Sequence, residues 1–156
     1  RGQLVGWQTR WLEPDDVRPN WVQKYNNTRD MPKRWTIWDY ERFYISQSPV
    51  VVVESVPTAL DLQTIGFPAV APFGGEVTPE QLKLLRACQR GVILAPDNDG
   101  PGMKFVSKAL DYLPRFIDVK VCEPVGEDGS GDDLADCEHS SEAVERIENA
   151  QDLSLL

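Results

Sequence analysis

Residues 91–100 read Gly91-Val92-Ile93-Leu94-Ala95-Pro96-Asp97-Asn98-Asp99-Gly100, and this stretch decides the fold. Its first five residues form an apolar run, which is typical of a strand buried on both faces of a sheet. Two carboxylates and a glycine follow directly. Pro101 can then occupy the first turn of a helix, which we expect to extend to Leu113. The stretch therefore predicts a buried strand, a short acidic loop and a helix.

The same unit of strand and helix recurs on both sides of this stretch. Apolar runs predict further strands over residues 50–53, 68–72 and 117–122. Helices are expected over residues 57–65, 79–89 and 141–150, and the second of these begins with a capping box formed by Thr78 and Gln81. Such alternation predicts an α/β fold of Rossmann-like type, with a mainly parallel four-stranded sheet flanked by helices.

Acidic residues follow three of the four predicted strands. Glu54 follows the first, Asp97 and Asp99 follow the third, and the segment Asp132-Asp133-Leu134-Ala135-Asp136 lies beyond the fourth. The carboxyl ends of parallel strands meet at one edge of a sheet, and ligand sites of such sheets lie there. Carboxylates that gather at one edge repel one another unless a cation binds, and oxygen ligands suit Mg²⁺. The alternative is that these acids are helix caps or turn residues.

The N-terminal part differs in character from the rest. All five Trp residues precede residue 49, and prolines and asparagines interrupt the pattern. Residues 2–11 predict a strand or hairpin of alternating character. We interpret the Trp residues as a small aromatic core, with base stacking as the alternative.

The composition excludes several classes of protein. The net charge of −9 excludes a uniformly basic nucleic-acid binder. Residues 117–156 hold two Lys/Arg and twelve Asp/Glu, and we interpret residues 138–152 as a solvated acidic tail. Three cysteines without a CxxC pair argue against a zinc site or a disulfide framework, and no apolar run is long enough for a membrane span. We therefore expect a cytoplasmic protein. Because Arg1 is not an initiating Met, we expect either a piece of a longer protein or a trimmed tag.

The acidic motifs resemble those of a TOPRIM domain, and most closely those of bacterial and phage-type DNA primases. Residues 97–104, Asp-Asn-Asp-Gly-Pro-Gly-Met-Lys, resemble the primase pattern DxDxAGxKA, and residues 132–136 resemble KDxxD. Residues 71–75 with 78–81 resemble the primase loop and the helix after it. Upstream, residues 6–10 resemble GFxxR and residues 24–27 resemble KYLNS. The resemblance covers about residues 3–137. It implies part of a primase polymerase subdomain over 1–48, a TOPRIM domain over 49–140 and an acidic helix or tail over 141–156.

The resemblance also implies a reaction. A primase module makes RNA primers on single-stranded DNA by metal-dependent nucleotidyl transfer, with ribonucleoside triphosphates as substrates and Mg²⁺ or Mn²⁺ as cofactor. It implies catalytic roles for Glu54, Asp97 and Asp99. The residues implied to hold metal are Glu54, Asp97, Asp99, Asp133 and Asp136. Those implied to contact nucleic acid or nucleotide are Arg10, Lys24 and Lys104. A replicative helicase is the implied partner, and the bacterial cytoplasm, of a host cell if a phage encodes the protein, is the implied location.

Three positions depart from the family pattern. Ser55 and Thr58 stand where primases usually have Gly and Asp, and Asp132 replaces the Lys of KDxxD. Two alternatives therefore stay open. A TOPRIM phosphodiesterase, such as a nuclease or topoisomerase, would cut with the same metal site, and a degenerate TOPRIM fold would serve as a scaffold without catalysis.

Overall fold

The computed structural model describes residues 5–73 and 76–152. The chain forms two compact units, Arg1–Pro32 and Lys33–Leu156, and each is described by itself. The first unit contains β1 (Gln8–Arg10), β2 (Tyr25–Asn27) and a 3-10 helix at Asp15–Val17. The strands of the second unit are β3 (Ile37–Trp38), β4 (Val50–Val52), β5 (Ala69–Pro72), β6 (Val92–Leu94) and β7 (Val119–Val121). Its α-helices are α1 (Arg42–Ile45), α2 (Val56–Thr64), α3 (Pro79–Leu85), α4 (Gly100–Tyr112) and α5 (Ser140–Glu148). Short 3-10 helices lie at Lys33–Trp35, Leu113–Arg115 and Leu134–Asp136.

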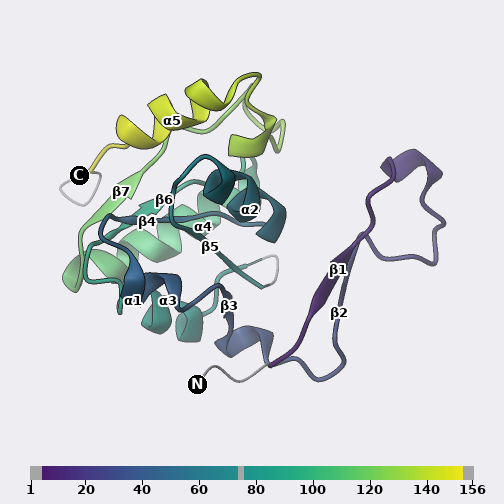
Figure 1. Ribbon diagram of the computed structural model, residues 1–156, viewed down its shortest axis with the longest axis horizontal. Coiled ribbons are helices and arrows are strands. Elements are labelled where there is room, and N and C mark those ends of the chain that lie inside the picture. Colours follow the sequence, from purple (N-terminus) through teal and green to yellow (C-terminus); the bar gives the residue numbers. More distant parts are fainter. Residues whose placement is uncertain (1–4, 74–75, 153–156) are drawn as a thin grey trace. The chain divides into compact units, whose positions relative to one another are not determined.

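The second unit is built on one sheet with the strand order β3-β5-β4-β6-β7 (Figure 1). The four strands from β5 to β7 are parallel, as the sequence predicts. The fifth strand, β3, was not predicted, and it pairs antiparallel with β5 at the edge. Only two residues of β3 pair in this way, and so short a strand has no period that sequence reasoning can detect.

Alternate side chains of the central strand build the two cores of this unit. Val50 and Val52 of β4 pack under α3 and α4, with Leu85 and Phe105 among their neighbours. The intervening valines, at positions 51 and 53, pack on the opposite face under α2 and α5. Helices therefore cover both faces of the sheet (Figure 1), which confirms the predicted α/β fold.

The predicted helices form, with ends shifted by one to four residues. The capping box at the start of α3 is confirmed, because the Thr78 hydroxyl accepts from Gln81 N–H and the Gln81 side chain accepts from Thr78 N–H. The helix ends at Leu85 rather than near residue 89, and a turn follows in which the Cys88 N–H bonds to the Leu85 carbonyl. In the described part of the chain, no helix is long and apolar enough to cross a membrane.

Two interpretations of the flanking segments are wrong. The acidic C-terminal segment is not a solvated tail, because α5 buries Ala143 and Ile147 against the sheet. In the first unit, Trp7 and Trp21 are exposed, and none of the described side chains of residues 5–32 is buried, so no aromatic core forms there. The first unit is instead a two-stranded antiparallel hairpin in which Thr9 pairs with Asn26. A lone hairpin has no second layer against which to bury its aromatic rings.

Candidate metal centre

The carboxyl ends of three parallel strands lie level with one another. Val52 pairs with Leu94, and Leu94 pairs with Val121. Glu54 lies two residues beyond the end of β4, and Asp97 lies three residues beyond the end of β6. The loop that follows β7 brings Asp133 back to the same edge, since the Asn98 N–H donates to the carbonyl of Asp132 at 2.9 Å.

Glu54 is tied to the acidic loop by a backbone contact. Its Oε1 accepts a hydrogen bond from the Asp97 N–H at 3.0 Å. Burial raises the pKa of Glu54, the Asp97 N–H opposes this rise, and the negative charges of Asp99 and Asp133 raise it further. The carboxylate therefore helps to shape the loop and belongs to the same electrostatic cluster as the aspartates.

Among the acids of the cluster, Asp97 has the most strongly raised pKa. Burial, and then the negative charges of Glu54, Asp133, Asp99 and Asp136, raise its pKa to about 7. Its Oδ1 is buried and has no hydrogen-bond partner. An ionised carboxylate in such a place needs a cation or a proton, because its neighbours supply only negative charge.

Asp99 begins helix α4. Its Oδ1 accepts from the Gly102 N–H at 2.7 Å and so caps the helix. Gly102 has no side chain where α4 approaches the cluster, and a Cβ there would lie 2.1 Å from the Asp97 carbonyl oxygen and 2.8 Å from Glu54 Oε1. Gly102 lies within helix α4, where the lack of a side chain permits this close approach.

Asp133 is held by three hydrogen bonds. Its Oδ1 accepts from the Ala135 N–H at 2.7 Å, and its Oδ2 accepts from the Thr58 hydroxyl. The Asp136 carboxylate accepts from the Asp133 N–H at 2.9 Å, which completes a capping box around the 3-10 helix at 134–136. The capping role that we weighed for these acids is therefore real for Asp99, Asp133 and Asp136.

The structure adds one residue to the site that the sequence analysis did not select. The buried Asn98 side chain donates to the carbonyls of Val125 at 2.8 Å, Gly126 at 3.2 Å and Glu127 at 3.0 Å. The backbone carbonyl of Asn98 accepts from the Gly131 N–H at 3.0 Å. Asn98 thus fastens the loop that carries Asp133 to the loop that carries Asp97. Its place between two aspartates was the available signal.

The cluster fits a hard cation that keeps much of its water. Its candidate ligand atoms are all carboxylate oxygens, and the buried Oδ1 of Asp97 accepts no hydrogen bond. Within the described ranges, no three His, Cys, Asp or Glu side chains are grouped closely enough to hold a metal ion by themselves. The arrangement suits Mg²⁺ or Mn²⁺ bound with water and substrate oxygens, and does not suit a closed structural site.

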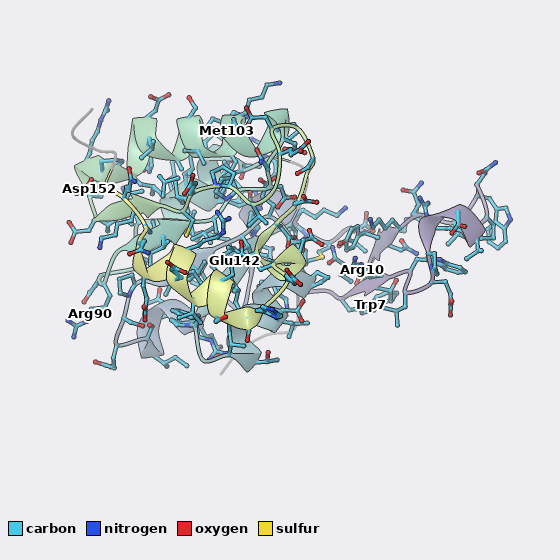
Figure 2. The ribbon with its side chains drawn as sticks, turned by 90° about the horizontal axis from the view of Figure 1, so that it is seen from above. Trp7, Arg10, Arg90, Met103, Glu142 and Asp152 are labelled. Carbon is cyan, nitrogen blue, oxygen red and sulfur yellow. The ribbon has the colours of Figure 1, made fainter. Side chains whose placement is uncertain are left out.

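The second unit also has a cavity. It has a volume of about 660 Å³ and opens between α4, the end of β7 and α5, with Met103, Cys122 and Arg146 in its lining. Figure 2 labels Met103 on α4 and Glu142 on α5, which lie on two of its walls. None of the predicted site residues lines this cavity, so the acidic cluster lies outside it.

The three predicted basic residues fall in different places. Arg10 and Lys24 line one hollow of about 410 Å³ in the first unit, together with Trp11. The Arg10 guanidinium carbon also lies 5.7 Å from the centre of the Tyr25 ring, and Figure 2 labels Arg10 and Trp7 in this unit. Lys104 belongs to the second unit, where it is exposed on α4. The structure therefore brings two of the three together.

Comparisons with known proteins agree with this fold. The Toprim-like family model matches residues 51–134, which is more than half of the chain. The catalytic core of Escherichia coli primase is 27% identical over 97% of this chain and 50% of its own, with a TM-score of 0.70. The RNA polymerase domain of Mycobacterium tuberculosis primase DnaG is 26% identical over 97% of this chain and 53% of its own, with a TM-score of 0.67.

A third similar structure is a DnaG primase catalytic domain bound to single-stranded DNA, 27% identical over 97% of this chain and 50% of its own, with a TM-score of 0.70. No curated protein sequence matches significantly. The chain spans about half the length of these solved structures. The level strand ends, the acidic cluster beyond them and the family match agree with one another, so this chain belongs to the Toprim-like family and is a primase-type TOPRIM module.

Proposed function

We propose that this chain supplies the metal-binding part of an enzyme that makes RNA primers on single-stranded DNA by nucleotidyl transfer. The observation that carries the proposal is Asp97, a carboxyl whose buried Oδ1 has no hydrogen-bond partner and which lies among four other acids. A structural carboxylate would be expected to have such an oxygen paired. An unpaired oxygen in an acidic cluster is a suitable ligand for a divalent cation.

The roles of the acids follow from their contacts. Asp97 would ligate the cation directly, and Glu54, Asp99, Asp133 and Asp136 would do so directly or through water. Bound Mg²⁺ or Mn²⁺ would assist loss of the attacking 3′-hydroxyl proton and neutralise charge on the phosphates of a ribonucleoside triphosphate. Glu54 also orients the loop through the Asp97 N–H, so it serves as a positioning residue whether or not it touches the cation.

Basic residues would hold the nucleic acid and the nucleotide. Arg10 and Lys24 share one hollow with an aromatic ring, an arrangement that suits a phosphate beside a stacked base. The likeness to a primase domain bound to single-stranded DNA supports this assignment. Lys104, exposed on α4, would contact a phosphate of the incoming nucleotide. A replicative helicase would be the partner, and the bacterial cytoplasm the location.

One observation favours a second candidate, a scaffold without catalysis. Asp99 and Asp133 cap helices, and Asp136 completes the capping box of Asp133, so capping alone accounts for these three acids. Capping does not account for Asp97, because its buried Oδ1 accepts no hydrogen bond from a helix N–H or from any other donor. The catalytic proposal is therefore preferred over the scaffold.

Asp99→Asn separates the two candidates, because Asn caps helices about as well as Asp. If Asp99 serves catalysis, primer synthesis by the natural full-length protein on a single-stranded template should fall by at least about 100-fold, while the melting temperature holds. Arg10→Ala is the matched variant for template binding, and it should weaken binding and reduce its salt dependence without changing the metal response. Wild-type primer synthesis by Asp99→Asn would leave the scaffold candidate.

A further inference from the structure

Thr58 joins helix α2 to the acidic cluster. Its hydroxyl donates to Asp133 Oδ2, a contact between residues 75 positions apart in the chain. The Ser55 hydroxyl lies 2.7 Å from the Thr58 hydroxyl, and the Ser55 oxygen accepts from the Thr58 N–H at 3.2 Å. Thr58 is 1% exposed, so its hydroxyl is shielded from water.

The direction of each hydrogen bond follows from the chemistry of its partners. An ionised carboxylate only accepts, so the single hydroxyl proton of Thr58 must point at Asp133. The Thr58 oxygen then accepts the proton of Ser55, whose own oxygen receives the Thr58 N–H. The three groups form one oriented chain that ends on the Asp133 carboxylate.

Helix capping does not explain the Thr58 hydroxyl. Ser55 is the N-cap of α2, and its oxygen already receives the backbone N–H of Thr58. The Thr58 hydroxyl takes no part in this cap and instead donates to the Asp133 carboxylate, which is distant in the sequence. A second carboxylate at position 58 would be unable to donate to an ionised Asp133 and would add another negative charge beside it.

We propose that Thr58 is a positioning residue of the metal centre, which fixes the Asp133 carboxylate in the orientation that a divalent cation requires, and that Ser55 fixes Thr58. The inference rests on the proposed function, because it assigns Asp133 to the cation. Groups that hydrogen-bond a ligating carboxylate orient it, and their loss weakens metal binding by about 10-fold or more. Thr58 thus acts through Asp133 and does not touch the cation.

The test is a calorimetric titration of the full chain with Mn²⁺ alone, accompanied by melting curves with and without Mn²⁺. Thr58→Val keeps the branched shape and removes the hydroxyl, and should weaken Mn²⁺ binding about 10-fold. Thr58→Ser keeps the hydroxyl and should bind within about two-fold of wild type, although it loses a buried methyl group. Ser55→Ala leaves Thr58 and Asp133 in place, and should weaken binding in the same direction by less.

The outcomes distinguish this inference from the proposed function. If Thr58→Val melts at a lower temperature but binds Mn²⁺ as wild type does, the hydroxyl is structural and the inference is overturned. If Thr58→Val does not fold, Ser55→Ala decides, and wild-type affinity in that variant overturns the inference. Asp97→Asn is the control for the site itself: unchanged Mn²⁺ binding in it would reject the proposed function, and the positioning role with it.

Discussion

At the scale of the residue, either a proton or a cation can relieve the electrostatic repulsion on the Asp97 carboxyl. Its neighbours carry negative charge and its Oδ1 is buried without a partner, so it gains from either a proton or a cation. Near neutral pH, a pKa of about 7 means that a proton and a cation compete for the same carboxyl. Metal binding should therefore weaken as the pH falls below this value.

The raised pKa of Asp97 predicts how the stability of the metal-free chain depends on pH. The folded chain keeps the proton up to pH about 7, whereas the unfolded chain releases it near pH 3.8. The stabilising effect of this group is therefore complete below the lower value and lost as pH rises through the higher one. Asp97→Asn should remove this loss.

As the pH rises from 5 to 8, we expect the melting temperature of Asp97→Asn to increase relative to that of wild type. Allowing for solvent screening of a partly buried group, this rise corresponds to about 1 kcal/mol, or about 2–4 °C. Melting curves in chelator at several pH values measure it. A constant difference in melting temperature between the two proteins across this range would show that the pKa of Asp97 is not raised.

Asn98 is expected to be the residue of the acidic loop most sensitive to substitution. Its side-chain amide donates to three carbonyls, at positions 125, 126 and 127. Asn98→Asp replaces this donor with an acceptor of nearly equal shape, so the carboxylate would face three carbonyl oxygens. We expect a loss of about 2–4 kcal/mol in the free energy of unfolding, measured by urea denaturation. Asn20→Asp, at an exposed position outside any helix or strand, is the control and should change stability by less than about 0.5 kcal/mol.

At the scale of the element, the start of helix α4 packs so closely against the acidic cluster that a Cβ on Gly102 would clash with it. Gly102→Ala would place a Cβ 2.1 Å from the backbone oxygen of Asp97, so the helix or the loop must shift. The free energy of unfolding should fall by about 1–3 kcal/mol. Mn²⁺ binding should weaken as well, because the same Cβ would lie 2.8 Å from Glu54 Oε1.

Gly100 provides a matched control for this substitution. A Cβ on Gly100 would meet nothing within 4 Å, and the residue belongs to the same helix. Gly100→Ala should therefore be neutral or slightly stabilising, since Ala restricts the unfolded chain more than Gly does. Equal destabilisation by both substitutions would show that helix flexibility, and not close packing, explains the glycine at position 102.

At the scale of the whole molecule, the two units should differ in local stability. The sheet of the second unit is built from completely buried residues such as Val51 and Val70, whereas residues 5–32 have no buried side chain among those described. Segments without buried apolar contacts open at a low cost in free energy. Backbone amides of β1 and β2 should exchange with deuterium at least about 100-fold faster than those of β4, β5 and β6. Equal protection of hairpin and sheet would contradict this expectation.

The sequence by itself determined the parallel part of the sheet and the candidate acids. The valine run before Glu54 and the apolar run before Asp97 have the short, bounded form of strands buried on both faces, and Pro and Thr marked the helix starts. These signals are local, because they depend on chemistry within a few residues of one another. The fold class, the four parallel strands and the family resemblance followed from them. The metal-binding roles of the acids stay a prediction.

Only the tertiary structure decided which groups meet at the end of the sheet. Thr58 contacts Asp133, Asn98 contacts the carbonyl of Glu127, and α5 packs on the sheet as part of the second core. Each contact joins residues that are far apart in the chain, and it exists because β4, β6 and β7 end at the same level. A loop sequence fixes neither its own path nor the partner of a given hydroxyl or amide. These depend on the packing of the whole second unit, which local periodicity does not encode.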